Sequence, residues 1–301
     1  MKRSKIKMLT LALTGVLMLG GLTGCGASEK SKENKKIGMV VSTLNNPFFV
    51  TMKDNAEKKA KELGYELIVV DSQDDAAKER SNVEDLIQKG VGAVIVNPTD
   101  SDAVGNAIKV ANESKVPVIT VDRQANKGDV VCHIASDNVK GGKVAAEFIL
   151  EKLGGKANIV EIQGQPGTSA ARDRGKGFHE GVDNKAGVKV VASQPADFNR
   201  QKGLTVMENI IQATPKFDAV FAHNDEMALG AAKALKGKKT IIVGFDGNDE
   251  AKKAVENGEI TATVAQQPDL MGTTAVENAV KVLKGEKVEK EVPVDLKLIK
   301  K

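Results

Sequence analysis

The sequence predicts an α/β protein made of two doubly wound, parallel-sheet lobes. From Lys36 onward, short runs rich in Val, Ile and Ala alternate with longer stretches in which apolar residues recur at helical spacing. Such alternation favours parallel sheets with right-handed crossovers and helices on both faces. The chain has 301 residues, enough for two lobes of roughly 100–150 residues each. Its strand candidates are too many for one open sheet, and an eight-fold barrel is the remaining alternative.

Ten segments are expected to be strands. They are Ile37–Val41, Leu67–Val70, Ala93–Val96, Val118–Val121, Val130–Ile134, Ile159–Ile162, Val188–Ala192, Ala219–Ala222, Ile241–Gly244 and Thr261–Ala265. Amphipathic segments lie between most of them, among them Met52–Leu63, Lys78–Lys89, Lys143–Leu153 and Thr205–Ala213. Aromatic residues make up only 3% of the chain, so the core is built from Ala, Val, Ile and Leu, which suits buried parallel strands. No single linker divides the chain, which suggests several short crossings between the lobes.

The first 24 residues have the layout of an export signal. Basic residues between Lys2 and Lys7 precede an apolar run, Met8–Leu22, that is too short and too rich in Gly for a convincing membrane-spanning helix. Leu-Thr-Gly before Cys25 resembles a bacterial lipoprotein signal, in which cleavage leaves the cysteine as a diacylated N-terminus. We therefore expect a signal peptide over 1–24, a lipidated Cys25 in a flexible tether over 25–36, and a location on the extracytoplasmic face of the cell membrane. An uncleaved anchor is the alternative.

The excess of basic charge belongs to this signal. The chain has 44 basic and 40 acidic residues, and the first 24 contain four basic and no acidic ones, which leaves 40 of each. A neutral mature chain offers no basic surface for nucleic acid. With Cys25 lipidated, Cys132 has no disulfide partner, and its apolar neighbours predict a buried structural thiol rather than a reactive one.

Polar residues follow almost every predicted strand. In doubly wound sheets, ligands bind beyond the carboxyl ends of the strands, so these residues are candidates for a binding site. They are Ser42–Asn46, Asn97-Pro98, Asp122-Arg123, Gln163-Gly164, Asn224-Asp225, Asp246-Gly247 and Gln266-Gln267. Helix capping explains any one of them equally well, but it does not readily explain a complete ring from both halves of the chain.

Four of the eight Phe residues lie in or beside the same loops: Phe48, Phe49, Phe198 and Phe245. They either anchor the loops or form apolar walls for the C–H faces of a sugar ring. Sugar hydroxyls donate and accept hydrogen bonds at once, and Asp, Asn, Gln and Arg supply the matching groups in fixed geometry.

Long motifs are spread over the whole predicted mature chain. They are Val-Val-Ser-Thr-Leu-Asn-Asn-Pro-Phe-Phe (40–49), Asn-Pro-Thr-Asp-Ser-Asp-Ala-Val-Gly-Asn (97–106), Asp-Arg-Gln (122–124), His-Ile-Ala-Ser-Asp-Asn (133–138), Gly-Thr-Ser-Ala-Ala-Arg-Asp-Arg-Gly (167–175), Ser-Gln-Pro-Ala-Asp-Phe (193–198), Asn-Asp-Glu-Met-Ala-Leu-Gly (224–230) and Val-Gly-Phe-Asp-Gly (243–247). With these motifs the chain resembles the ribose-binding members of the periplasmic pentose/hexose-binding family, which serve ABC importers and share their lobe fold with sugar-responsive repressors.

The resemblance implies capture of D-ribose, without catalysis or a cofactor, and delivery to the membrane permease subunits of an ABC importer. A chemoreceptor is an additional partner to consider. The implied polar contacts are Asn46, Asp122 and Arg123 from the first lobe, and Arg174, Asn224, Asp246 and Gln266 from the second lobe and the hinge. Phe48, Phe49 and Phe198 would sandwich the sugar ring.

The lobes of the family are discontinuous in sequence and joined by a three-stranded hinge. Here this implies an N-terminal lobe from 37–136 and 267–295, and a C-terminal lobe from 137–266 and 296–301. Two features depart from the family pattern: the lipoprotein signal, which puts a soluble periplasmic location in doubt, and Cys132. Neither affects the implied site.

Three other functions are alternatives to capture of D-ribose for an importer. A glycosidase could use Asp122 and Asp246 as paired carboxylates, but Arg123 beside Asp122 favours the ionised form. His133, His179 and His223 lack metal-ligand spacing, so no metal is expected. A repressor would need a basic helix-turn-helix module where this chain has an export signal. The third alternative is a binding protein for another small sugar, such as allose or xylose. Only the motif match favours ribose over these sugars.

Overall fold

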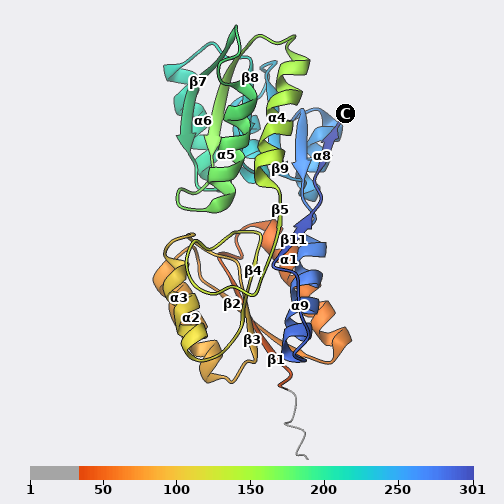
Figure 1. Ribbon diagram of the computed structural model, residues 1–301. Helices are drawn as coiled ribbons and strands as arrows, with labels where there is room; N and C mark the ends of the chain where they lie inside the picture. The colour runs from red at the N-terminus through yellow and green to blue at the C-terminus, as the bar shows by residue number, and fades with distance from the viewer. Residues whose placement is uncertain (1–33) are drawn as a thin grey trace, which may run out of the picture. The chain divides into compact units, whose positions relative to one another are not determined.

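The computed structural model describes residues 34–301, and in this part of the chain two lobes each contain one six-stranded sheet (Figure 1). The predicted signal peptide, Cys25 and most of the predicted tether lie outside the described residues. Among residues 34–301, no helix combines the length and apolar character needed to span a membrane.

The sheet of the first lobe has the strand order β11-β5-β4-β3-β1-β2, and all its neighbours are parallel. Its strands are β1 (Lys36–Val41), β2 (Glu66–Asp71), β3 (Ala93–Val96), β4 (Val118–Val121), β5 (Cys132–Ser136) and β11 (Glu291–Val294). Helices α1 (Pro47–Leu63) and α9 (Pro268–Leu283) pack on one face, and α2 (Ala76–Gln88) and α3 (Val104–Glu113) pack on the other. Both faces of this sheet are therefore buried, as the unbroken apolar strands predict.

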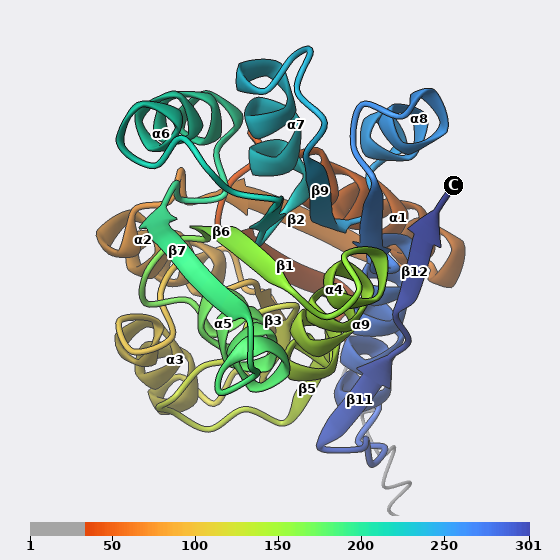
Figure 2. The ribbon, with the colours of Figure 1, turned by 90° about the horizontal axis from the view of Figure 1, so that it is seen from above.

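The sheet of the second lobe has the order β12-β10-β9-β8-β6-β7, with only β12 antiparallel to its neighbour. Its strands are β6 (Ala157–Gln163), β7 (Val188–Pro195), β8 (Ala219–Ala222), β9 (Ile241–Asp246), β10 (Ala262–Ala265) and β12 (Lys297–Lys300). One face carries α4 (Asn138–Lys152) and α5 (Ser169–Val182), and the opposite face carries α6 (Arg200–Ala213), α7 (Asp225–Ala234) and α8 (Asp249–Asn257) (Figure 2).

The prediction of two doubly wound lobes is confirmed, and the barrel alternative is wrong because both sheets are open. Strand β5 begins at Cys132, two residues after the predicted start. Strands β11 and β12 were not predicted. Both are only four residues long and mostly exposed or half-buried, and Pro293 interrupts the apolar pattern of β11. Short edge strands of this kind carry little periodic signal.

The described chain passes between the two sheets three times. The crossings lie between β5 and α4, between β10 and α9, and between β11 and β12. Each crossing is short, which explains why no linker is visible in the sequence.

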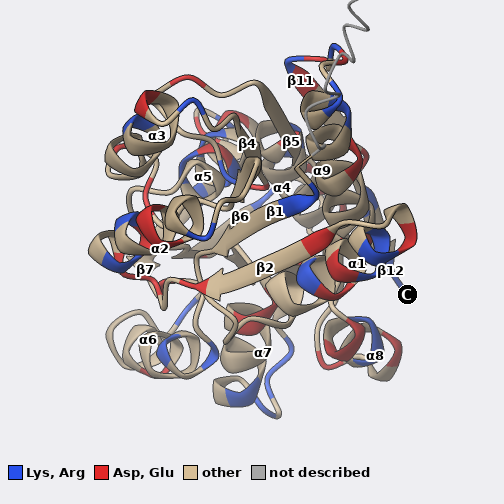
Figure 3. Cartoon of the chain, turned by 90° about the horizontal axis from the view of Figure 1, so that it is seen from below, with Lys and Arg blue, Asp and Glu red and all other residues tan. Residues whose placement is uncertain are grey.

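Acidic and basic residues are interspersed along the outer helices in the view of Figure 3. Pairs one helical turn apart join them, such as Lys53 with Glu57 on α1 and Arg80 with Glu84 on α2. The outer faces of these two helices therefore carry charges of both signs.

Candidate functional site

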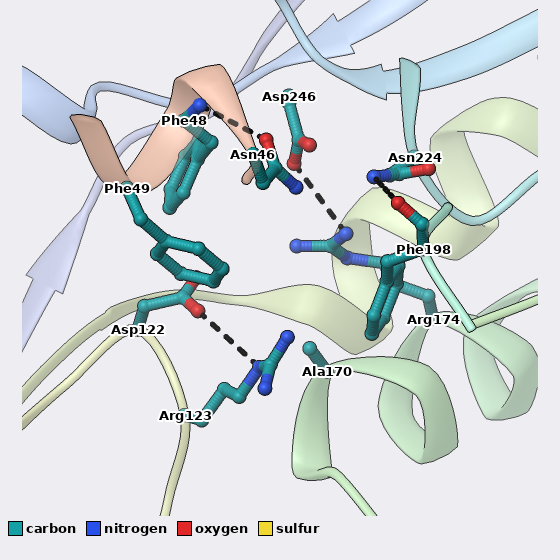
Figure 4. A pocket seen from close by; sticks show the side chains of 10 residues that line it. All are labelled: Asn46, Phe48, Phe49, Asp122, Arg123, Ala170, Arg174, Phe198, Asn224 and Asp246. Atoms are coloured by element: carbon teal, nitrogen blue, oxygen red, sulfur yellow. Dashed lines mark hydrogen bonds and ion pairs between the residues drawn. The ribbon is translucent and has the colours of Figure 1, made fainter. Parts of the chain in front are cut away.

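The loops at the carboxyl ends of both sheets line a small cavity between the lobes (Figure 4). Its lining residues are Asn46, Phe48, Phe49, Asp122 and Arg123 from the first lobe, and Ala170, Arg174, Phe198, Asn224 and Asp246 from the second. Nine of them are among the ten predicted contact residues. The tenth, Gln266, lies directly behind the lining and donates from its Nε2 to Asp246 Oδ1 at 2.9 Å.

Ala170 is the one lining residue that the sequence did not indicate. It lies in the first turn of α5 and is buried. A small apolar residue at a helix start carries no signal of a binding role, so only the structure could find it.

Two asparagines cap a helix and line the cavity at the same time. Asn46 Oδ1 accepts the Phe48 N–H at 3.0 Å at the start of α1, which leaves its amide nitrogen to the cavity (Figure 4). Asn224 Oδ1 accepts the Met227 N–H at 3.0 Å at the start of α7, and its Nδ2 donates to the Phe198 carbonyl at 3.2 Å. Capping and ligand contact are therefore compatible at these positions, since capping uses only the side-chain oxygen.

Asp122 and Arg123 follow β4 and are both almost fully buried. Asp122 Oδ2 accepts from Asn97 Nδ2 at 3.1 Å and lies 3.8 Å from Arg123 Nε. Burial raises the pKa of Asp122, and the charge of Arg123 opposes the rise. Asp122 Oδ1 and Arg123 Nε are buried without a hydrogen-bond partner, so an acceptor and a donor remain free for a ligand.

Arg174 is fixed on three sides. Its Nε donates to Asn138 Oδ1 at 2.8 Å, and its Nη1 donates to the His223 carbonyl at 2.7 Å. The guanidinium lies over the ring of Phe245, 3.8 Å from the centroid, which is within the range of a cation–π contact. Arg174 therefore presents its remaining donors to the cavity in a defined direction.

Asp246 stands at the end of β9, 3.5 Å from Arg174 Nη1. Burial raises the pKa of its carboxyl to about 7, although Arg174 and the Gln266 amide favour the ionised form. Gln266 Oε1 is buried and has no hydrogen-bond partner among the described residues. The second lobe thus supplies free acceptors beside a fixed cation.

The rings add two apolar walls. Phe48 and Phe49 lie edge to face, with centroids 5.4 Å apart. Phe198 comes from the opposite lobe and is also buried. Aromatic faces beside guanidinium donors and carboxylate acceptors suit a small, polyhydroxylated ring.

His133, His179 and His223 all lie outside the lining of this cavity. His133 pairs with Thr120 Oγ1 at 2.8 Å, His179 with Asp183 Oδ1 at 3.0 Å, and His223 with Glu161 Oε1 at 3.0 Å. Within residues 34–301, no cluster of His, Cys, Asp or Glu has the geometry to hold a metal ion. Cys132 is buried in the core of the first lobe, and its burial raises the pKa of the thiol to about 11.

Residues 37–287 match the family described as the periplasmic binding protein domain. The ribose import binding protein of Haemophilus influenzae is 54% identical over 296 residues, which are 98% of this chain and 99% of that protein. The protein of the same name from Escherichia coli is 58% identical over 277 residues, covering 91% of this chain and 93% of that protein. The structure of the Caulobacter myo-inositol binding protein bound to myo-inositol is 34% identical, with a TM-score of 0.85 and coverage of 93% of this chain and 96% of that chain. A family match and relatives of this identity agree with a cavity between two doubly wound lobes: the chain belongs to the periplasmic binding protein family.

Proposed function

We propose that the protein captures D-ribose between its lobes and delivers it unchanged to the permease subunits of an ABC importer. The observation that carries the proposal is the cavity itself, where buried donors and acceptors without partners face aromatic walls. Relatives named ribose import binding proteins are 50–58% identical over nearly the whole chain, which supports ribose over other sugars.

Each free polar group has a role in this proposal. Asp122 Oδ1 and Gln266 Oε1 accept from ribose hydroxyls, and Arg123 Nε donates to a ribose oxygen. Asn46, Arg174, Asn224 and Asp246 complete the polar contacts, while Phe48, Phe49 and Phe198 cover the C–H faces of the ring. Hydrogen bonds to charged groups contribute about 1.5–3 kcal/mol each, so the set is sufficient for a dissociation constant on the order of 1 μM or below.

The cavity is small, and side chains of both lobes line it. The lining is buried from both sides, so a ligand enters only when the lobes separate. The three crossings supply the hinge, with lobes formed by 37–136 plus 267–295 and by 137–266 plus 296–301.

The protein acts on the extracytoplasmic side of the membrane, as expected for its family. The finer proposal is that a diacylated Cys25 anchors it there, because Leu-Thr-Gly-Cys ends the export signal and two acyl chains give stable anchoring. At this location the partner that receives the sugar is the permease of the importer. A chemoreceptor is a second candidate partner of the closed, sugar-bound form.

Binding of another small sugar is the competing function. A solved relative with 29% identity holds D-allose, and the myo-inositol complex above has the same fold. Titration calorimetry of the sugar-free protein with ribose, allose, xylose and myo-inositol decides between them. We expect ribose to bind at least tenfold more tightly than the others, and chromatography to recover it unchanged after long incubation. Equal affinities, or a reaction product, would reject the ribose proposal.

A further inference from the structure

The backbone around Asp246 is unusual for a residue with a side chain. Asp246 has a φ of 117° and Gly247 has a φ of 73°. L-residues rarely adopt positive φ, and such conformations persist where neighbouring groups hold them. The direction of the Asp246 carboxylate therefore depends on whatever fixes the turn after β9.

Two buried side chains outside the cavity lining hold this turn. Asp225, the first residue of α7, accepts the Asn248 N–H on Oδ2 at 2.8 Å. Thr263, in β10, accepts the Gly247 N–H on Oγ1 at 3.3 Å and donates to Asp225 Oδ1 at 2.6 Å. The side chains of Asp225 and Thr263 thus bind both backbone amides that follow Asp246, and we call this pair the clamp. Both residues have 0% exposure.

The glycines of this region leave room for the clamp. A Cβ at Gly244 would collide with Asp225 Oδ1, and a Cβ at Gly247 would collide with the side chain of Ala265. Neither Asp225 nor Thr263 lines the sugar cavity. Their side-chain hydrogen bonds go to the turn that carries Asp246 and to each other.

We propose that Asp225 and Thr263 are positioning residues for sugar capture, which direct the Asp246 carboxylate into the cavity by binding the Gly247 and Asn248 amides. The inference rests on the proposed function for its ligand. Thr263→Val keeps the shape of the side chain and removes the hydroxyl, so that the Gly247 amide and Asp225 Oδ1 each lose one hydrogen bond. Without this support the turn relaxes, and the Asp246 carboxylate leaves the direction that the ligand requires.

Thr261 provides a matched control. Its hydroxyl accepts the Ile242 N–H at 3.1 Å, at the opposite end of β9 from the cavity. Thr261→Val therefore removes the same kind of hydrogen bond from the same pair of strands, without touching the 246–248 turn.

The test is a double-mutant cycle read by titration calorimetry with ribose. We expect Thr263→Val to weaken binding about tenfold (about 1.4 kcal/mol), Thr263→Ser to restore it to within about threefold, and Thr261→Val to leave it within about twofold. In the Asp246→Ala background, Thr263→Val should change affinity by less than about twofold, because the residue through which it acts is gone.

Equal losses from Thr263→Val in both backgrounds, or equal effects of Thr263→Val and Thr261→Val, would overturn the positioning role. Asp225→Asn gives a second variant, expected to lose at least about tenfold in affinity; if it does not fold, the Thr263 variants still decide. If the wild type and Thr263→Val bind ribose with equal affinity, only the positioning role is rejected. Wild-type protein that binds no sugar of the panel rejects the proposed function together with it.

Discussion

The guanidinium of Arg123 lies over the ring of Phe198, 5.3 Å from its centroid, although the two residues come from different lobes. On its other side the same guanidinium lies 5.2 Å from the centroid of Phe49. Arg123 is thus held between an aromatic ring of its own lobe and one of the opposite lobe. The contact therefore joins the two lobes at the wall of the cavity.

Phe198→Leu should therefore weaken ribose binding by about tenfold. Leu keeps an apolar wall but removes the cation–π contacts of Phe198 with Arg123 and Arg174, which contribute about 0.5–2 kcal/mol each. Phe217→Leu is the control, since Phe217 packs against the core of the same lobe away from the cavity. Calorimetry of both variants is the measurement, and similar losses in the two would show that the effect is on core packing.

Asp246→Ala should lower ribose affinity about a hundredfold and keep the fold. The change removes acceptors for sugar hydroxyls and leaves Arg174 without its acidic neighbour. A ligand favours the closed form only by its differential affinity for the two states. Small-angle scattering should therefore show compaction of the wild type at a ribose concentration that leaves Asp246→Ala open. Equal compaction of the two proteins would contradict closure through this residue.

The pKa of Asp246, raised by burial to about 7, predicts a pH-dependent affinity. Ribose hydroxyls donate to the ionised carboxylate, so binding below this pH displaces a proton. Affinity should fall by up to about tenfold per pH unit below 7 and level off above it. Calorimetry near pH 6 in two buffers of different ionisation enthalpy measures the proton release directly. Binding heats that are independent of the buffer would argue against this assignment.

The same raised pKa affects stability in the opposite sense. The pKa of the Asp246 carboxyl lies above its ordinary value of 3.8. Its contribution to the stability of the fold is therefore complete below about pH 3.8 and is lost as the pH rises through about 7. Asp246→Asn stays neutral at every pH. Its melting temperature without sugar, relative to wild type, should therefore rise between about pH 5 and about pH 8. A constant difference across this range would contradict a buried carboxyl that ionises there.

Serine contacts between the lobes should tune affinity from outside the cavity. Ser101 Oγ accepts the Ser169 N–H at 3.0 Å, and Ser169 Oγ accepts the Gln124 N–H at 2.8 Å. Ser101 belongs to the first lobe and Ser169 begins α5 in the second. Ser169→Ala should weaken ribose binding by about threefold to tenfold, since it removes one hydrogen bond of the closed form. Ser114→Ala, in the C-terminal cap of α3, is the control and should not change affinity.

Cys25→Ser should change the location of the protein without changing its site. Two acyl chains give stable anchoring, so the wild type should fractionate with membranes and be labelled by palmitate in cells. The variant should be released or remain uncleaved, with wild-type ribose affinity after purification. A wild-type protein recovered soluble and without lipid would overturn the anchor.

The sequence determined the two-lobe class, because every buried parallel strand must be apolar along its length and the helices between them must be amphipathic. It also indicated nine of the ten cavity residues. Ligands of such sheets bind beyond the strand ends, and the long motifs singled out strand-end residues that line the cavity. The edge strands β11 and β12 were not predicted, because a partly exposed strand of four residues need not be apolar along its length.

Only the tertiary structure decided how the cavity is held. Asp122, Phe198 and Asp246 all have positive φ without being glycine, and no local pattern predicts that conformation. Groups distant in sequence hold these residues: Asn97 binds the Asp122 carboxylate, and the clamp of Asp225 and Thr263 binds the turn after Asp246. The partners of a buried polar group depend on which elements pack together. The sequence by itself therefore indicated most of the residues that line the cavity, while the packing of the lobe decided which groups hold them in place.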